Sequence, residues 1–272
     1  MITNFLLVKF PSTTSDWTTY WNMRENLYES HIQAWKSIWD QAGIEIQGTP
    51  DILPLQQTTN TSLYWILSSI RDDWPWSLSP GSLASNGYNG HTFWDCETWM
   101  YPSIMMLNTP LGKSLLDYRF NHRAGALHKS KTYFPAYNGT MFPWEDAFSG
   151  NEVCPIGVGT CRYEQHITGD IAFALRQYWS NTHDVQWLDQ IGFPLVYDIC
   201  VFWASRGKIH SDWTPSSILF NNIASKVKLS GAQYVIDGVI PPDEYHTGVN
   251  NSVYTNVVRT SEFTYSQSNL LT

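Results

Sequence analysis

The sequence predicts an all-α protein, and three features of its 272 residues support this prediction. Apolar residues recur at spacings of three and four along several separate stretches, which is the period of one helix face. Glycine- and aromatic-rich loops separate these stretches. The expected helices also pair by length, with their long loops at one end. Together these features indicate an α/α architecture, and the periodicity alone leaves a bundle, a solenoid and a toroid open.

Three helices are expected in the first part of the chain. An apolar stripe runs over residues 20–38, and Gly43 marks the end of this first helix. A second stripe covers 63–70, and a third helix is expected over 98–107. Pro102 must lie in the first turn of that third helix, because a proline deeper inside would remove a backbone hydrogen bond. We interpret these stripes as packing faces rather than as a cofactor site.

Three further helices are expected in the second part of the chain. One starts at Leu111 and runs towards Lys129, and the next carries its apolar stripe over 167–178. The last covers 188–202 and closes with Gly207 at the C-cap position. With the first three, these segments make the chain mostly helical.

Long loops connect the expected helices over 81–95, 132–163 and 207–256. Loops of this length in a compact domain are usually functional or disordered, and their many aromatic residues argue against disorder. Within the last loop, the string YVIDGVI at 234–240 places two short apolar runs around Asp-Gly, which predicts a β-hairpin. That hairpin would deliver residues 241–244 at its exit.

Composition and charge narrow the class of protein. Aromatic residues make up 15% of the chain, as do charged residues, which suits sugar binding as well as it suits an aromatic-rich core. The net charge is −8 and no run of Lys or Arg occurs, so we expect neither a nucleic acid nor an anionic membrane surface as partner. Residues 1–11 have no basic region, and their apolar run is too short for a signal peptide or a membrane span, so we expect a cytoplasmic location.

No metal or cofactor is expected. The four cysteines form no C-x-x-C pair, and they allow two disulfides without requiring any. The spacing of His91, Asp95 and His166 matches no known set of metal ligands. The chain also lacks a G-x-S-x-G string, an H-E-x-x-H string and a glycine-rich phosphate loop after a strand.

The adjacent acids Asp243 and Glu244 are the first candidates for chemistry. Pro241 and Pro242 stiffen the backbone before them, and a general acid must be held within reach of its substrate. The charge of Asp243 would raise the pKa of Glu244, which suits an acid that stays protonated near neutrality. A solvated acidic turn is the other interpretation of this pair.

The segment GYNGHTFWDCETW at 87–99 is the second candidate. A carboxylate beside an indole can grip a sugar, because Asp95 could bind two hydroxyls while Trp94 stacks on the ring. The alternative is a helix N-cap at Asp95 with aromatic residues in the core. The segments FPWEDAFSGNE and YEQHITGD carry related side chains, and His166 could contact a hydroxyl or belong to a buried network.

Five motifs in this order resemble the catalytic domain of glycoside hydrolase family 65: GYNGHTFWDCETWMYP, FPWEDAFSGNEVCP, EQHITGDIAFA, FWASR and GVIPPDEYHTGVNNSVYTN. The resemblance covers roughly residues 25–258. It implies an (α/α)6 barrel, a toroid with the active site at its loop-bearing mouth, and an inverting mechanism. Glu244 would be the general acid, and Trp94 and Asp95 would bind the glucosyl ring. Four residues in resembling segments are assigned to the same pocket: Trp144, Glu145, Gln165 and His166.

The chain departs from the family pattern in three respects. No counterpart is found for the β-sandwich that precedes the barrel in the family, for a downstream Lys-Gln pair that grips the sugar, or for the general base. An inverting hydrolase needs a second carboxylate, about 6.5–9.5 Å from the acid, to activate water. In the family that base lies in a downstream segment with no counterpart here, so the resemblance implies a barrel incomplete at its C-terminal side. We expect residues 1–18 to be an N-terminal tail or linker remnant and 19–272 a partial catalytic domain. The chain would then be a fragment of a full enzyme or a short sugar-binding protein.

Three functions remain open at this point. The first is a hydrolase that releases glucose from an α-glucoside such as glucosyl-galactosyl-hydroxylysine. The second is a phosphorylase of the same family, in which phosphate replaces the activated water. The third is a non-catalytic sugar-binding remnant. The expected partner in each case is a carbohydrate.

Overall fold

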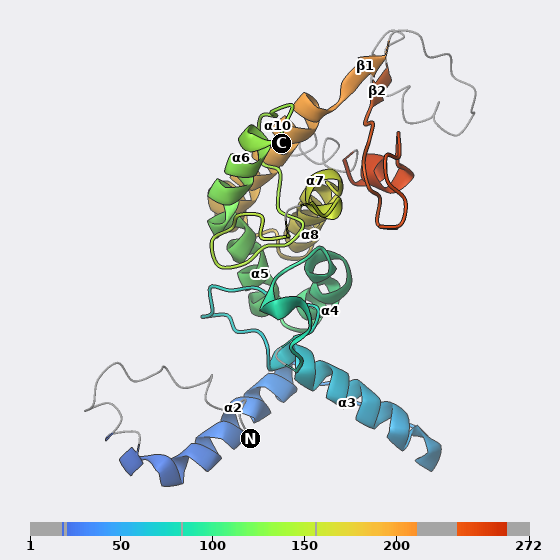
Figure 1. Ribbon diagram of the computed structural model, residues 1–272. Coiled ribbons are helices and arrows are strands. Elements are labelled where there is room, and N and C mark those ends of the chain that lie inside the picture. Colours follow the sequence, from blue (N-terminus) through green and yellow to red (C-terminus); the bar gives the residue numbers. More distant parts are fainter. Residues whose placement is uncertain (1–17, 19–20, 83, 156, 211–232, 260–272) are drawn as a thin grey trace.

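The structure is a computed structural model that describes residues 18, 21–82, 84–155, 157–210 and 233–259. The N-terminal tail predicted for 1–18 lies outside these residues, apart from Thr18. The prediction of a mostly helical chain is confirmed (Figure 1). The α-helices are α2 (Arg24–Ala42), α3 (Leu53–Leu67), α4 (Tyr101–Leu107), α5 (Thr109–Asn121), α6 (Arg123–Thr132), α7 (Thr160–Tyr163), α8 (Ile167–Thr182), α9 (Val185–Trp187) and α10 (Phe193–Arg206). Residues 253–259 are helical as well.

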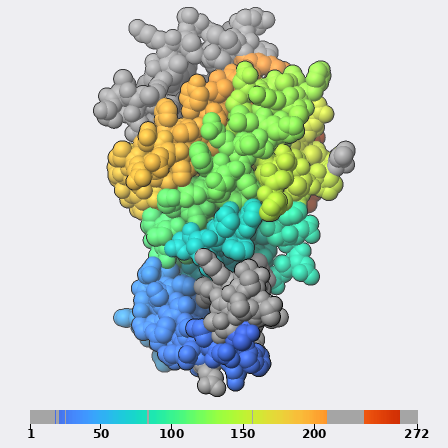
Figure 2. Space-filling view, turned by 90° about the vertical axis from the view of Figure 1, so that its left-hand side faces the viewer, coloured from blue at the N-terminus to red at the C-terminus, as the bar shows by residue number. Residues whose placement is uncertain are grey.

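The helices form a central body with projections at both ends. Helices α2 and α3 diverge from one end of this body, and the strands and residues 236–259 lie at the other (Figure 1). Figure 2 shows the same order on the surface, with α2 in blue at one end and α10 in orange towards the other. None of the helices in the described ranges has the length and hydropathy needed to cross a membrane.

The core lies around α8, which packs against α4, α5 and α10, and α4 also packs against α5. The apolar stripe predicted on the fifth helix is buried, with Ile167 and Ile171 fully enclosed in α8. Trp203 and Phe202 on α10 are also fully buried and belong to the same cluster. Side-chain burial of this kind is the main favourable contribution to folding, and it places the first turn of α8 at the centre of the molecule.

Two helices begin with a widened turn directly before a proline. The π-turn Cys96–Met100 precedes α4, whose first turn contains Pro102 as predicted. The π-turn Leu188–Gly192 precedes α10, whose first turn contains Pro194. A proline ring collides with the carbonyl four residues earlier and offers no N–H to it, so the preceding turn opens. The sixth predicted helix, 188–202, is therefore divided into the π-turn and α10, and α9 (Val185–Trp187) directly precedes it.

The fourth predicted helix is also divided, at His122. There α5 ends and α6 begins, because the side chain of His122 is held by Asp146 at 3.1 Å and packs against the Tyr118 ring. The turn brings Gly125 against the backbone of Gly150, where a side chain would leave no room. Tertiary contacts thus interrupt a stretch whose spacing is continuous.

The hairpin predicted for 234–240 is wrong. Strand β2 (Gln233–Val235) pairs antiparallel with β1 (Lys208–His210) and not with residues 238–240. Val239 instead forms an isolated antiparallel bridge with Val249. Two asparagine side chains accept hydrogen bonds from the backbone that a hairpin would have used. Asn251 accepts from the N–H of Ile236 at 3.2 Å, and Asn250 accepts from that of Gly238 at 2.9 Å.

Candidate active site

The segment of Trp94 and Asp95 enters the site immediately before the π-turn Cys96–Met100. Asp95 is half-buried and occupies the N-cap position of this turn, but its side chain makes no capping hydrogen bond. Burial raises the pKa of Asp95, and its own backbone N–H partly opposes this. A half-buried carboxylate without a capping role is available to a ligand.

Aromatic rings from the residues next to Asp95 in the chain pack against two other segments. The rings of Phe93 and Trp144 meet edge to face with centroids 5.1 Å apart, and the Trp94 ring meets the imidazole of His166 in the same way at 5.1 Å. Edge-to-face packing holds each indole in one orientation. The site therefore has fixed aromatic walls contributed by three separate segments.

Glu244 lies on an exposed turn. Partial burial raises the pKa of Glu244, and the nearby charge of Asp95 raises it further. The charge of His166 and the indole N–H of Trp144 act in the opposite direction. Glu244, Asp95, Trp144 and His166 are therefore neighbours in space, although four different segments carry them.

Asp243 has a different role from the one predicted. We expected its charge to raise the pKa of Glu244, but burial and Asp95 are the causes. Asp243 instead closes its own turn, accepting from the backbone N–H of Tyr245 at 3.2 Å and contacting Nδ1 of His246 at 2.8 Å. Asp243 thus stabilises the turn, and Glu244 is the carboxylate that Asp95, Trp144 and His166 influence.

Trp144 and Glu145 are held by a carboxylate that sequence reasoning did not single out for this role. Glu152 accepts from the backbone N–H groups of Trp144 and Glu145 at 2.8 and 2.9 Å, and from Nζ of Lys129 at 2.6 Å. Glu145 itself is buried, and Oε1 lies 2.7 Å from Nδ1 of His91. The indole nitrogen of Trp144 is buried, and Glu244 is the neighbour whose ionised form its N–H favours.

Gln165 and His166 are fully buried, and their polar atoms have protein partners. The side chain of Gln165 accepts from Nε of Arg206 at 2.7 Å and donates to the carbonyl of Arg162 at 3.2 Å. Both ring nitrogens of His166 contact carboxylates. The buried-network interpretation of His166 is thus observed, and direct contact of these two residues with a sugar stays a prediction.

A second buried network holds the residues on either side of Trp94 and Asp95 in place. Arg119 is fully buried and holds Glu97 with two hydrogen bonds, Nε to Oε1 at 2.7 Å and Nη2 to Oε2 at 2.9 Å. It also donates to Asp146 and to the carbonyl of Phe93, each at 3.3 Å. Glu97 lies inside the motif at 87–99, but nothing in its spacing indicates a partner 22 residues away.

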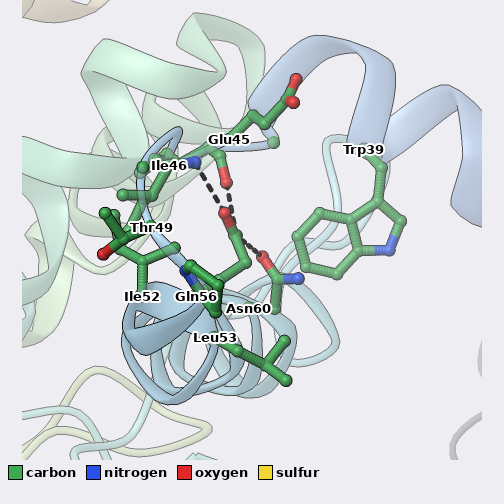
Figure 3. Close-up of a pocket in the computed structure, with 12 residues that line it drawn as sticks. Trp39, Glu45, Ile46, Thr49, Ile52, Leu53, Gln56 and Asn60 are labelled. Atoms are coloured by element: carbon green, nitrogen blue, oxygen red, sulfur yellow. Dashed lines mark hydrogen bonds between the residues drawn. The ribbon is translucent and has the colours of Figure 1, made fainter.

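A pocket of about 780 Å³ lies elsewhere, between the end of α2 and the start of α3 (Figure 3). Its central polar side chain, Gln56, accepts from the N–H of Ile46 at 2.6 Å and donates to the carbonyl of Ile44 and to Asn60. No carboxylate of the Glu244 cluster lines it. Because Gln56 already has protein partners, we place the candidate active site at the open cluster around Glu244. The described residues contain no group of His, Cys, Asp and Glu arranged for a metal ion.

A mostly helical fold with carboxylates near aromatic rings is compatible with a carbohydrate-active enzyme domain. The sequence profile of the glycosyl hydrolase family 65 central catalytic domain matches residues 61–271, and the chain belongs to this family. The resemblance noted from the motifs is thereby confirmed. Members similar to this chain include both glycoside hydrolases and phosphorylases.

Three curated relatives illustrate this range. The chain is 48% identical over 237 residues to the protein-glucosylgalactosylhydroxylysine glucosidase of Dictyostelium discoideum, covering 86% of this chain and 30% of that protein. It is 36% identical over 233 residues to a kojibiose hydrolase of Flavobacterium johnsoniae, with coverage of 86% and 30%. It is 30% identical over 239 residues to a kojibiose phosphorylase of Caldanaerobacter subterraneus, with coverage of 84% and 28%. The chain thus spans about 30% of the length of these relatives.

One solved structure has a similar fold. A candidate kojibiose phosphorylase from human microbiome superposes with a TM-score of 0.76 at 23% sequence identity, covering 90% of this chain and 30% of that one. At this identity the likeness concerns the fold alone.

Proposed function

We propose that this chain carries the glucose-binding site and the general acid of an inverting glycoside hydrolase that releases glucose from an α-glucoside. The observation that supports this most directly is that partial burial and the charge of Asp95 both raise the pKa of Glu244, whose neighbours include the indole of Trp144 and the charge of His166. A general acid must be protonated when the substrate binds, and the raised pKa of Glu244 suits that role.

In the proposed reaction, Glu244 gives its proton to the glycosidic oxygen while the bond from that oxygen to the anomeric carbon breaks. Trp94 stacks on the glucosyl ring, and Asp95 accepts hydrogen bonds from its hydroxyls. Glu244 is then ionised, and the charge of His166 and the N–H of Trp144 stabilise this form, since both lower its pKa. Water attacks the opposite face of the ring and inverts the anomeric carbon.

Activating that water requires a second carboxylate about 6.5–9.5 Å from the acid. The carboxylates of the described cluster have other roles. Glu164 contacts His166 at 3.0 Å, Glu145 contacts His91 at 2.7 Å, and Asp95 is assigned to the ring. We therefore propose that the base comes from outside the described residues.

We also infer that the described helices form part of an (α/α)6 toroid, with Glu244 at its mouth. Two observations support this. Helices α5, α8 and α10 pack side by side, and the segments that carry Trp94, Trp144 and Glu244 are loops that converge at the amino end of α8. The family match and the fold likeness favour the same architecture.

The proposed substrate is glucosyl-galactosyl-hydroxylysine or a related α-glucoside. The support is the name and the 48% identity of the Dictyostelium glucosidase, together with the 36% identity of a kojibiose hydrolase. Kojibiose and the hydroxylysine-linked disaccharide are therefore the two substrates to compare in an assay.

The test is the variant Glu244→Gln, which keeps the size of the side chain but cannot donate an acid proton. We expect glucose release to fall by about 10²–10⁴-fold, while sugar binding measured by calorimetry persists. Asp243→Asn is the matched control, because Asp243 closes the turn and we expect a much smaller loss. The assay uses a protein that carries both this chain and the proposed base. Equal, measurable turnover of that protein with and without Glu244→Gln would refute the assignment of the acid.

A phosphorylase is the second candidate, because a kojibiose phosphorylase is 30% identical to this chain. Parallel assays with and without inorganic phosphate separate the two reactions, since a phosphorylase forms glucose 1-phosphate and depends on phosphate. Binding of kojibiose without turnover under either condition would instead favour the sugar-binding interpretation.

A further inference from the structure

His166 is enclosed by two carboxylates from its own part of the chain. Its Nδ1 lies 2.6 Å from Oδ2 of Asp170, one turn further along α8, and its Nε2 lies 3.0 Å from Oε1 of Glu164. Both His166 and Glu164 are fully buried, and Asp170 is nearly so. A ring whose two nitrogens both face carboxylates can satisfy both contacts only when both nitrogens carry a proton.

Two aromatic residues from other segments complete this enclosure. The imidazole meets the Trp94 ring and the Tyr254 ring edge to face, each with a centroid distance of 5.1 Å. The hydroxyl of Tyr254 also donates to Oδ1 of Asp170 at 2.8 Å, so both oxygens of Asp170 have partners. The cluster joins the segment of the sugar-binding candidates, the start of α8 and the helix that follows the Glu244 turn.

We propose that His166 is a positioning residue that does not touch the sugar. Held as an imidazolium between Glu164 and Asp170, it fixes Trp94 and the Glu244-bearing segment against each other and keeps one positive charge beside the acid. This inference rests on the proposed function, because it assigns to Glu244 the acid whose ionisation the charge controls.

The charges around the ring agree with this geometry. Burial alone would lower the pKa of His166, but its contacts with Asp170 and Glu164 outweigh burial and raise it to about 9. Burial also raises the pKa of Glu164, against the effect of His166, and Glu244 and Asp170 contribute in the same direction as burial. The positive charge in turn lowers the pKa of Glu244, opposing burial and Asp95.

The first experiment measures the charge. The carboxyl of Glu244 is titrated by carbon-13 NMR in the 272-residue chain, and its resonance is assigned by its absence from Glu244→Gln. In His166→Gln, which is neutral but can still hydrogen bond, we expect the pKa of Glu244 to rise by about one pH unit. His128→Gln is the matched control, since His128 lies on the exposed face of α6, and we expect no change there. A folded His166→Gln with an unchanged Glu244 titration would overturn the inference.

The second experiment measures position and remains informative if His166→Gln does not fold. Tyr254→Phe keeps the ring but removes the hydroxyl that binds Asp170. We expect faster amide hydrogen exchange in residues 236–259 and in the segment around Trp94. Tyr245→Phe is the control, because the Tyr245 side chain is 98% exposed. Identical exchange in Tyr254→Phe and the wild-type chain would contradict the positioning role.

Both measurements are made without substrate, so a failure of the positioning role can be told apart from a failure of the proposed function. If Glu244→Gln retains full turnover, the acid assignment fails even when the titration shifts as expected. If Glu244→Gln abolishes release but neither His166→Gln nor Tyr254→Phe has its expected effect, the positioning role of His166 fails alone.

Discussion

At the scale of single residues, opposing influences act on the carboxyl of Glu244. Burial and Asp95 favour its protonated form, whereas His166 and the indole of Trp144 favour the ionised form. An acid that must lose a proton during the reaction and regain it afterwards needs both forms to be accessible. The neighbours of Glu244 provide this balance, although none of them lies beside it in the sequence.

The buried pair of Arg119 and Glu97 gives a prediction at the same scale. Glu97→Gln would leave the enclosed guanidinium with one fewer carboxylate partner. We expect the free energy of unfolding to fall by about 3 kcal/mol in chemical denaturation, because the buried guanidinium loses its bidentate carboxylate and keeps only the longer carboxylate contact, with Asp146.

The control for that variant is Asp40→Asn. The pair of Lys36 and Asp40 lies on the surface of α2, with both side chains more than 60% exposed. Its loss should change the free energy of unfolding by less than about 0.5 kcal/mol. Equal effects of the two variants would show that the Arg119 network does not stabilise the fold more than a surface pair.

At the scale of elements, the segment at 236–251 is organised by side chains instead of by a hairpin ladder. Asn251 adopts a positive φ of 55°, which asparagine tolerates better than most residues, and its side chain accepts from the buried Ile236. The side chain of Asn250 likewise accepts from the backbone N–H of Gly238, at a more exposed position. This arrangement holds the turn of Glu244 against α7, where the N–H of Ile240 donates to the carbonyl of Tyr163 at 2.9 Å.

These two asparagines give a matched pair of variants. Asn251→Ala leaves the N–H of Ile236 buried without its partner and adds strain at a positive φ, so we expect a loss of about 1–3 kcal/mol. Asn250→Ala should have a smaller effect, because water can reach Gly238. Thermal unfolding and exchange of the Ile236 amide measure both. A larger loss in Asn250→Ala than in Asn251→Ala would contradict this account.

At the scale of the whole molecule, the protonation of His166 links stability to pH. The pKa of His166 is about 9 in the folded protein and 6.5 in its ordinary state, so folding binds a proton between these values. The stabilisation is complete below pH 6.5 and is lost as the pH rises through 9. We expect the Tm of the wild-type chain to fall over this window and that of His166→Gln to fall less. Parallel curves would contradict the proposed charge state.

The helical parts of this architecture were predictable from local patterns. The stripe over 167–178 is buried as expected, and Pro102 lies in the first turn of α4. The divisions at His122 and before Pro194 were not predicted, because they depend on contacts with Asp146 and on the widened turn. The hairpin prediction was wrong for a related reason. The backbone N–H groups of Ile236 and Gly238 bond to the side chains of Asn251 and Asn250 and not to residues across the Asp-Gly turn.

By itself, the sequence determined the mostly helical class, the motif residues and the family, because apolar periodicity and contiguous motifs are local properties of the chain. Only the tertiary structure decided that Asp95 influences the pKa of Glu244, that His166 lies between two carboxylates and that Arg119 holds Glu97. These relations depend on which distant segments pack together. Packing selects partners by shape, burial and charge across the whole fold, and spacing along the chain does not encode that choice.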